Sequence, residues 1–147
     1  MIAIDTNVLL RYLLQDDKVQ ACKATALITG QDTVLVTDIV LAETLWVLTG
    51  RRYKLDREGV VRVINALFAE PNIAFEDGQT VWRALNDYIK AQPVKAGGKK
   101  KYADFPDALL VNKARYQAKE WHKPLVRTYT FDTAARELPG TLSALEL

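Results

Sequence analysis

Cysteine and histidine are nearly missing from this chain of 147 residues, which contains one of each, Cys22 and His122. A single cysteine excludes an intrachain disulfide and a zinc site built on cysteines. A single histidine argues against a histidine-based catalytic triad and against a metal site with several histidines. No apolar run has the length of a transmembrane helix, and the N-terminus lacks the pattern of a signal peptide. We therefore expect a cytoplasmic protein without a membrane partner.

Excess charge is missing as well, because 20 Lys and Arg residues are balanced by 18 Asp and Glu, which leaves a net charge of +2. So mild a charge does not establish a nucleic-acid partner. Hydrophobic residues make up 49% of the chain and charged residues 26%, which is typical of a globular protein. The length suits one domain with a sizeable core. We expect a single domain over residues 1–147, since the sequence contains no internal repeat or interdomain linker.

Short apolar runs alternate with helical patterns along the chain. We expect strands at residues 2–4, 33–37, 72–76 and 124–131. We expect helices at residues 5–14, 16–29, 38–50, 56–70, 77–92, 104–121 and 132–138, with a Gly/Lys loop at residues 93–102. This alternation predicts an α/β fold, a three-layer α/β/α sandwich whose central sheet is mostly parallel and covered on both faces.

Acidic residues follow the predicted strands. Asp5 follows the first strand and Asp132 the last, while Asp104 and Asp107 open the helix that precedes the last strand. In open parallel sheets, ligands bind beyond the carboxyl ends of the strands, so several of these acids can converge at one edge. Each of the four also fits a structural role as a helix cap or first-turn acid. Asp38, which follows the second strand, is interpreted as a cap alone.

Converging carboxylates repel one another and raise each other's pKa unless a cation is bound. A hard divalent cation, Mg²⁺ or Mn²⁺, removes that conflict and prefers oxygen ligands. Because the chain has so little histidine and cysteine, oxygen-only ligation is the natural metal hypothesis. Such a metal binds phosphates and orients water for in-line attack.

Glu43 is the acid with no helix end to cap. The residues three and four positions from it are all apolar: Ile39, Val40, Trp46 and Val47. No local lysine or arginine can therefore pair with it. The pattern predicts a buried helix, in which an unpaired carboxylate is costly, and this favours a functional role. The alternatives are a long-range pair with an arginine and a helix face that is exposed.

Four segments in order resemble the motifs of PIN-domain nucleases: IAIDTNVLLRYLL, DIVLAETLWVL, DFPDALL and TYTFD. The match of order and spacing extends over almost the whole chain. The resemblance implies a PIN-like fold and a metal-dependent RNA endonuclease that uses Mg²⁺ or Mn²⁺. It implies four catalytic, metal-binding acids, which are Asp5, Glu43, Asp107 and Asp132.

The same resemblance assigns supporting residues. Thr6 and Asn7 match the polar residues that brace the first acid, and Thr130 matches the hydroxyl residue before the fourth. In the third motif, Asp107 aligns best with the acid before ALL, while Asp104 lies one turn earlier. We expect Asp104 to be a cap that can also share the metal site.

Small free-standing PIN domains resemble the toxins of VapBC-type toxin–antitoxin pairs, which implies an antitoxin partner and a homodimer. Lys99, Lys100 and Lys101 precede Asp104 and are candidates to hold the RNA backbone, with a solvated loop as the alternative. Residues 51–54, RRYK, form a second basic and aromatic patch that we interpret first as a solvated helix end. The core or an interface is the expected place of Trp46, Trp82 and Trp121.

Two rival functions belong to other classes. A phosphatase of the haloacid dehalogenase type also begins with a strand that ends in Asp, but it needs a second Asp where this chain has Asn7. A non-catalytic PIN-like RNA-binding or scaffold domain usually loses acids, whereas this chain retains a full set. The metal-dependent ribonuclease is therefore the function that the sequence favours.

Overall fold

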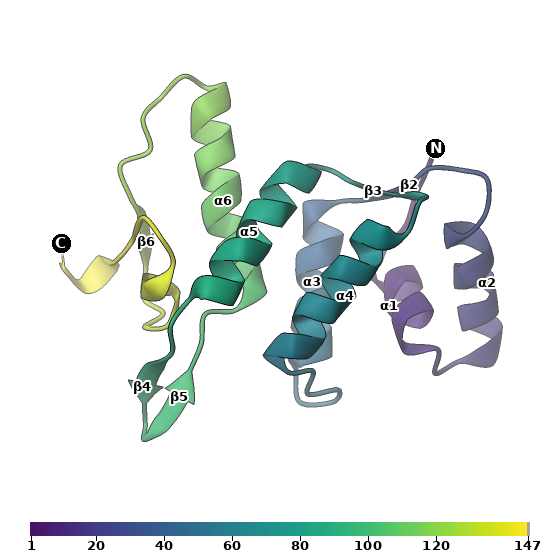
Figure 1. The fold of residues 1–147 in the computed structure, drawn as a ribbon, viewed down its shortest axis with the longest axis horizontal. Coiled ribbons are helices and arrows are strands. Elements are labelled where there is room, and N and C mark those ends of the chain that lie inside the picture. Colours follow the sequence, from purple (N-terminus) through teal and green to yellow (C-terminus); the bar gives the residue numbers. More distant parts are fainter. Residues whose placement is uncertain (147) are drawn as a thin grey trace. The chain divides into compact units, whose positions relative to one another are not determined.

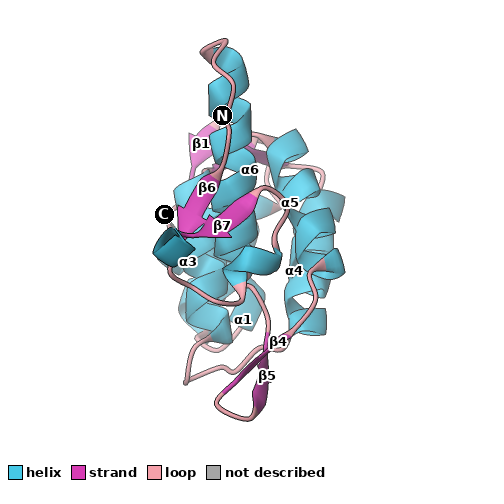
Figure 2. Cartoon of the chain, turned by 90° about the vertical axis from the view of Figure 1, so that its left-hand side faces the viewer, coloured by secondary structure: helices cyan, strands magenta, loops and turns pink. Residues whose placement is uncertain are grey.

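The computed structural model describes residues 1–146, and the chain divides into two compact units (Figure 1). The first unit comprises Met1–Gly78, and the second begins at Gln79. Helices are more extensive than the short strands in both units (Figure 2). No helix within residues 1–146 is both long enough and apolar enough to cross a membrane.

The first unit is built on a parallel sheet of three strands in the order β1-β2-β3. Its strands are β1 (Ile2–Ala3), β2 (Val34–Val36) and β3 (Ile73–Phe75). Its helices are α1 (Thr6–Leu14), α2 (Lys18–Ile28), α3 (Asp38–Thr49) and α4 (Arg57–Ala69). Val34 and Val36 of the central strand are completely buried, as are the helix residues Leu9, Leu45 and Ile64. The core of this unit therefore lies where β2 meets the apolar faces of its helices.

Side-chain caps define the starts of these four helices. Asp5, Asp17 and Asp56 cap α1, α2 and α4, each accepting a hydrogen bond from a backbone N–H three residues later. The cap of α3 is Thr37, whose hydroxyl accepts from Val40 N, and not Asp38. Asp38 is the first helical residue, so its predicted role as the cap is wrong by one position. An acid in the first turn still favours the helix dipole.

All of α5 (Gly78–Lys90) except its first residue lies in the second unit, which continues through a hairpin to α6 (Phe105–Glu120). Its strands are β4 (Val94–Ala96), β5 (Lys99–Lys101), β6 (Thr128–Thr130) and β7 (Thr141–Ser143), with 3₁₀ helices at Ala135–Glu137 and Ala144–Glu146. Tyr88 of α5 packs edge-on against Phe105 of α6, with ring centroids 6.0 Å apart. Asp87 of α5 also accepts hydrogen bonds from Asn112 and Arg115 of α6. These contacts fasten the two helices together.

Two expectations for the second unit are wrong. Residues 93–102 contain the antiparallel hairpin β4–β5, whose turn uses the left-handed φ angles of Gly97 (58°) and Gly98 (76°), a conformation that glycine adopts without strain. The expected strand at 124–131 narrows to β6, and β7, which was not predicted, pairs with it in parallel. The three tryptophans, Trp46 of the first unit and Trp82 and Trp121 of the second, are exposed rather than in a core, and an interface stays a prediction for them.

The predicted α/β fold is confirmed. The strand pairs β1–β2, β2–β3 and β6–β7 are parallel, and the hairpin β4–β5 is antiparallel. Helices follow the parallel strands in chain order, as crossover connections require. These elements are compatible with the three-layer α/β/α arrangement.

The cap of α4 gives a test of local stability. Asp56 Oδ1 accepts from Gly59 N at 2.7 Å. We expect Asp56→Ala to lower the free energy of unfolding by about 1 kcal/mol, because the N–H loses its partner. Asp56→Ser retains a capping oxygen and should restore most of the loss in urea unfolding. Equal losses for the two variants would show that the cap does not stabilise the helix.

Candidate functional site

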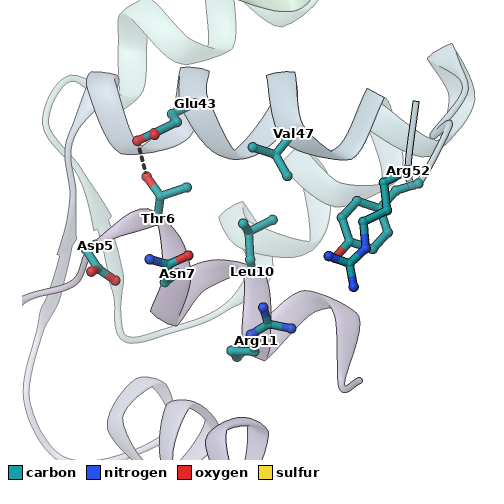
Figure 3. Close-up of a pocket in the computed structure, with 9 residues that line it drawn as sticks. Asp5, Thr6, Asn7, Leu10, Arg11, Glu43, Val47 and Arg52 are labelled. Atoms are coloured by element: carbon teal, nitrogen blue, oxygen red, sulfur yellow. Dashed lines mark hydrogen bonds between the residues drawn. The ribbon is translucent and has the colours of Figure 1, made fainter. Parts of the chain in front are cut away.

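A cavity of about 380 Å³ in the first unit brings together several predicted site residues (Figure 3). It lies beside the start of α1 and along α3. Its lining consists of Asp5, Thr6, Asn7, Leu10, Arg11, Glu43, Val47, Arg52 and Tyr53. The cavity therefore contains both acids that the sequence assigned to this half of the chain.

Asp5 reaches the cavity because β1 ends just before it and α1 begins just after it. Its backbone is extended, and its Oδ1 accepts from Val8 N at 2.9 Å. The cap that the sequence offered as an alternative role is thus real, but it uses one oxygen only. Within residues 1–146, the second oxygen makes no hydrogen bond, so Asp5 can cap α1 and bind a ligand at once.

Glu43 is exposed, so its predicted burial is wrong. The apolar residues that suggested a buried helix do not surround it in a core, since Ile39 and Trp46 are 77% and 71% exposed. Glu43 is instead fixed by Thr6, whose Oγ1 donates to Glu43 Oε2 at 2.6 Å (Figure 3). Thr6 was expected to brace the first acid. In the structure it braces the second.

The other end of this cavity is cationic and aromatic. Arg11 lies one helical turn after Asn7 on α1, and it forms an ion pair with Asp16 at 2.5 Å. Arg52 and Tyr53 come from the turn that follows α3, with the guanidinium 5.1 Å from the ring centroid. Arg11 was not among the predicted site residues, although its spacing of four from Asn7 places both on one face of a helix.

The second unit holds the remaining predicted acids around Lys101. The Lys101 ammonium donates to Asp132 Oδ2 at 2.5 Å. Asp132 Oδ1 accepts from the backbone N–H groups of Ala134 and Ala135. Burial alone would raise the pKa of Asp132, but Lys101 and these two N–H groups outweigh it and lower the pKa. Thr130 Oγ1 accepts from Asp132 N at 3.0 Å, which fixes the turn, and the auxiliary role of Thr130 stays a prediction.

Asp104 and Asp107 show the opposite shift. Loss of hydration raises the pKa of Asp104, and the charge of Asp132 raises it further. Loss of hydration also raises the pKa of Asp107, with Asp104 as the next cause. Asp104 occupies the N-cap position of α6 but makes no side-chain capping bond. It is therefore a cap by position only, and its carboxylate adds to a local excess of negative charge.

The predicted RNA-binding lysines lie on β5 and are exposed. Lys101 is engaged by Asp132, whereas Lys100 stands opposite Lys95 of β4 in the hairpin. Two ammonium groups directly opposite each other are destabilising in the free protein. This hairpin is thus a concentrated positive charge beside the acids of its own unit.

Carboxylate oxygens are the donors that Mg²⁺ or Mn²⁺ would meet here. Within residues 1–146, no three His, Cys, Asp or Glu side chains are gathered closely enough to hold a metal ion. The chemistry of the donors nevertheless fits a hard cation, because such ions select oxygen ligands. The raised pKa values of Asp104 and Asp107 show that positive charge would be favourable beside them.

The raised pKa of Asp107 predicts a stabilising substitution. Its folded pKa lies above the unfolded value, so the folded chain carries the ionised group at a cost at neutral pH. We expect Asp107→Asn to raise the free energy of unfolding at pH 7, measured in EDTA. The gain should disappear by about pH 3, where the carboxyl is largely neutral in both states.

The neighbouring acid supplies the control. The pKa of Asp132 is lowered, so its ionised form stabilises the folded chain above the unfolded pKa. Asp132→Asn should therefore lower the free energy of unfolding at pH 7. The same sign for both variants would contradict the charge distribution described above.

Comparison with known proteins identifies the family. The PIN domain family matches residues 2–118, which is most of the chain. A search of curated proteins finds no match. The matched range contains Asp5, Glu43 and Asp107 and ends before Asp132. PIN domains are typically nucleases, which supports a hydrolase that acts on nucleic acids. The chain belongs to the PIN-domain family and has its nuclease-type fold.

Proposed function

We propose that this PIN domain is an endoribonuclease that depends on Mg²⁺ or Mn²⁺. The observation that carries the proposal is the cavity in which Asp5 and Glu43 are both fixed by other groups of the protein. The cap bond to Val8 N fixes Asp5, and the Thr6 hydroxyl fixes Glu43. Two preset carboxylates in an open cavity suit a phosphate-binding cation better than they suit a structural role.

The proposal keeps four acids as metal ligands, Asp5 and Glu43 in the first unit and Asp107 and Asp132 in the second, with Asp104 in support. A bound divalent cation would supply positive charge for the scissile phosphate and lower the pKa of an attacking water. Thr6 contributes by holding one Glu43 oxygen and leaving the other for ligation. In-line attack of water on the RNA phosphodiester would leave 5′-phosphate and 3′-hydroxyl ends.

Lys101 has to leave Asp132 before Asp132 Oδ2 can bind a cation, because the ammonium already occupies that oxygen. Once released, Lys101 would join Lys99 and Lys100 as positive groups for the RNA backbone. The ion pair thus keeps the charge of Asp132 balanced in the free protein. We propose that the hairpin β4–β5 exchanges this internal contact for a phosphate contact.

Conservative substitutions of the two cavity acids test the nuclease proposal. Asp5→Asn retains an N-cap oxygen, and Glu43→Gln retains the shape of an exposed side chain, so both variants should fold. We expect each to lower the rate of RNA cleavage in Mg²⁺ by more than about 100-fold, since loss even of an outer-shell partner costs up to that much. Gel analysis of a labelled RNA gives the rates.

Asp17→Asn is the matched control, because Asp17 caps α2 in the same manner and does not line the cavity. It should cleave RNA at the rate of the unsubstituted protein. Cleavage that persists in EDTA would contradict the metal requirement. Equal cleavage by all four proteins would remove the activity from this cavity and favour the non-catalytic RNA-binding or scaffold alternative.

The phosphatase alternative loses its remaining support. The position two residues after Asp5 carries Asn7, and this amide lines the cavity where that enzyme class needs a carboxylate. The match to the PIN domain family is also a match to a nuclease-type fold. We therefore retain the ribonuclease.

We further propose that the protein is a homodimeric toxin, neutralised in the cytoplasm by an antitoxin protein. The order of the four motifs in a small PIN domain supports this role. Induced expression should arrest bacterial growth, and Glu43→Gln at equal abundance should not. Growth arrest by both proteins would mean that toxicity is independent of cleavage and would contradict the proposal.

A further inference from the structure

The cavity of the first unit has two chemically different ends. Asp5 lies at one end and Arg52 at the other, with Leu10 and Val47 between them (Figure 3). The apolar pair offers nothing to a phosphate or a cation, but it suits a sugar or a base. In a nucleic-acid strand, charged phosphates alternate with sugars and bases. The acidic, apolar and cationic parts of the cavity follow the same order, so the cavity suits a strand of more than one nucleotide.

The turn that carries Arg52 and Tyr53 is tied to α3. Lys54 N donates to Gly50 O, and Leu55 N donates to Leu48 O, both at 2.9 Å. Lys54 also adopts a left-handed φ of 50°, which reverses the chain sharply. The RRYK patch is thus a solvated helix end, as first interpreted, and backbone hydrogen bonds hold it in a defined turn.

Arg52 is the cation of this end that is available to a ligand. The guanidinium of Arg11 is already paired with Asp16 at 2.5 Å. Arg52 is exposed and forms no salt bridge with any residue in 1–146. Its guanidinium lies over the Tyr53 ring, and its charge also helps to lower the pKa of Asp16, whose carboxylate is already held by Arg11. The planar guanidinium of Arg52 can therefore present two parallel N–H donors, the geometry that a phosphate accepts.

We propose that Arg52 and Tyr53 form a subsite for single-stranded RNA, with the guanidinium on a phosphate next to the scissile one and the ring stacked on a base. This subsite rests on the ribonuclease proposal, because it would hold the RNA that the neighbouring acids are proposed to cleave. Aromatic side chains stack on unpaired bases with little preference for sequence. Paired bases hide their faces, so the subsite would favour unpaired segments of the substrate.

Binding without cleavage tests the phosphate contact. A fluorescein-labelled uridine oligonucleotide would be titrated in EDTA and followed by fluorescence anisotropy at several salt concentrations. Arg52→Gln should weaken binding by about tenfold and reduce the slope of log K against log salt by about 0.7, the value for one phosphate on a single strand. Arg51→Gln is the matched control, because Arg51 is an exposed neighbour that does not line the cavity.

Two substitutions of Tyr53 test the stacking contact. Tyr53→Phe keeps the ring and should bind within about twofold of the unsubstituted protein, whereas Tyr53→Leu should lose about tenfold, as expected for one stacked base. Tyr53→Phe and Tyr53→Leu should bind a duplex RNA with equal affinity, because paired bases are not available for stacking. Thermal unfolding of both variants verifies the fold, since Tyr53 is half-buried.

Several results would overturn the subsite. If Arg51→Gln and Arg52→Gln lost equal affinity for the oligonucleotide, the arginines would attract RNA by diffuse charge rather than by a defined contact. Equal affinities of Tyr53→Phe and Tyr53→Leu would exclude stacking, and failure of the unsubstituted protein to bind the single strand would exclude both contacts.

Cleavage kinetics separate this subsite from the nuclease proposal. In Mg²⁺, Arg52→Gln should raise KM with kcat nearly unchanged, because the contact serves binding and not the chemical step. Cleavage that is indifferent to Arg52 would overturn the subsite alone. Binding that depends on Arg52, in a protein that cleaves no RNA, would overturn the nuclease and leave the subsite as an RNA-binding site.

Discussion

The parallel pairing of β1 with β2 determines the geometry of the cavity. Ile2 pairs with Val34 and Ala3 with Leu35, so both strands end at the same edge of the sheet. The helices that follow, α1 and α3, begin at that edge, and the Thr6–Glu43 hydrogen bond joins them at 2.6 Å. A shift of register by one residue would move Thr6 away from Glu43 and reverse the faces of the strand residues. The register of β1 against β2 therefore determines where Asp5 and Glu43 lie in the cavity.

In the second unit, charge balance rather than strand pairing distinguishes the acids. Asp132 has an ammonium and two backbone N–H groups as partners, and its pKa is lowered. Asp104 and Asp107 lack an equal share of that stabilisation, and their pKa values are raised. These three carboxylates of one unit thus differ in their affinity for protons. The charge of Asp132 is balanced by Lys101, whereas additional positive charge near Asp104 and Asp107 would stabilise their ionised forms.

The sequence predicted features that depend on local chemistry. Asp5 caps α1 as a short polar side chain can, and α2 and α4 begin close to the predicted residues 16 and 56. The parallel strands β1, β2 and β3 lie where apolar runs occur. Features that depend on distant packing were missed. The apolar residues around Glu43 indicated burial, but only the tertiary structure decides which helix face is covered. The strand β7 exists through its pairing with β6, which its own three residues do not reveal.

The double role of Asp5 has a consequence for how the site can change. Its rotamer is fixed by the α1 cap before any ligand arrives, so ligand binding has little side-chain entropy left to lose. Because the Asp5 carboxylate both caps α1 and is a proposed metal ligand, selection for folding and selection for activity act on the same group. Glu43 caps no helix, so a substitution there can abolish its proposed role as a metal ligand without destabilising a helix end. Inactive descendants of this chain should therefore change at Glu43 more freely than at Asp5.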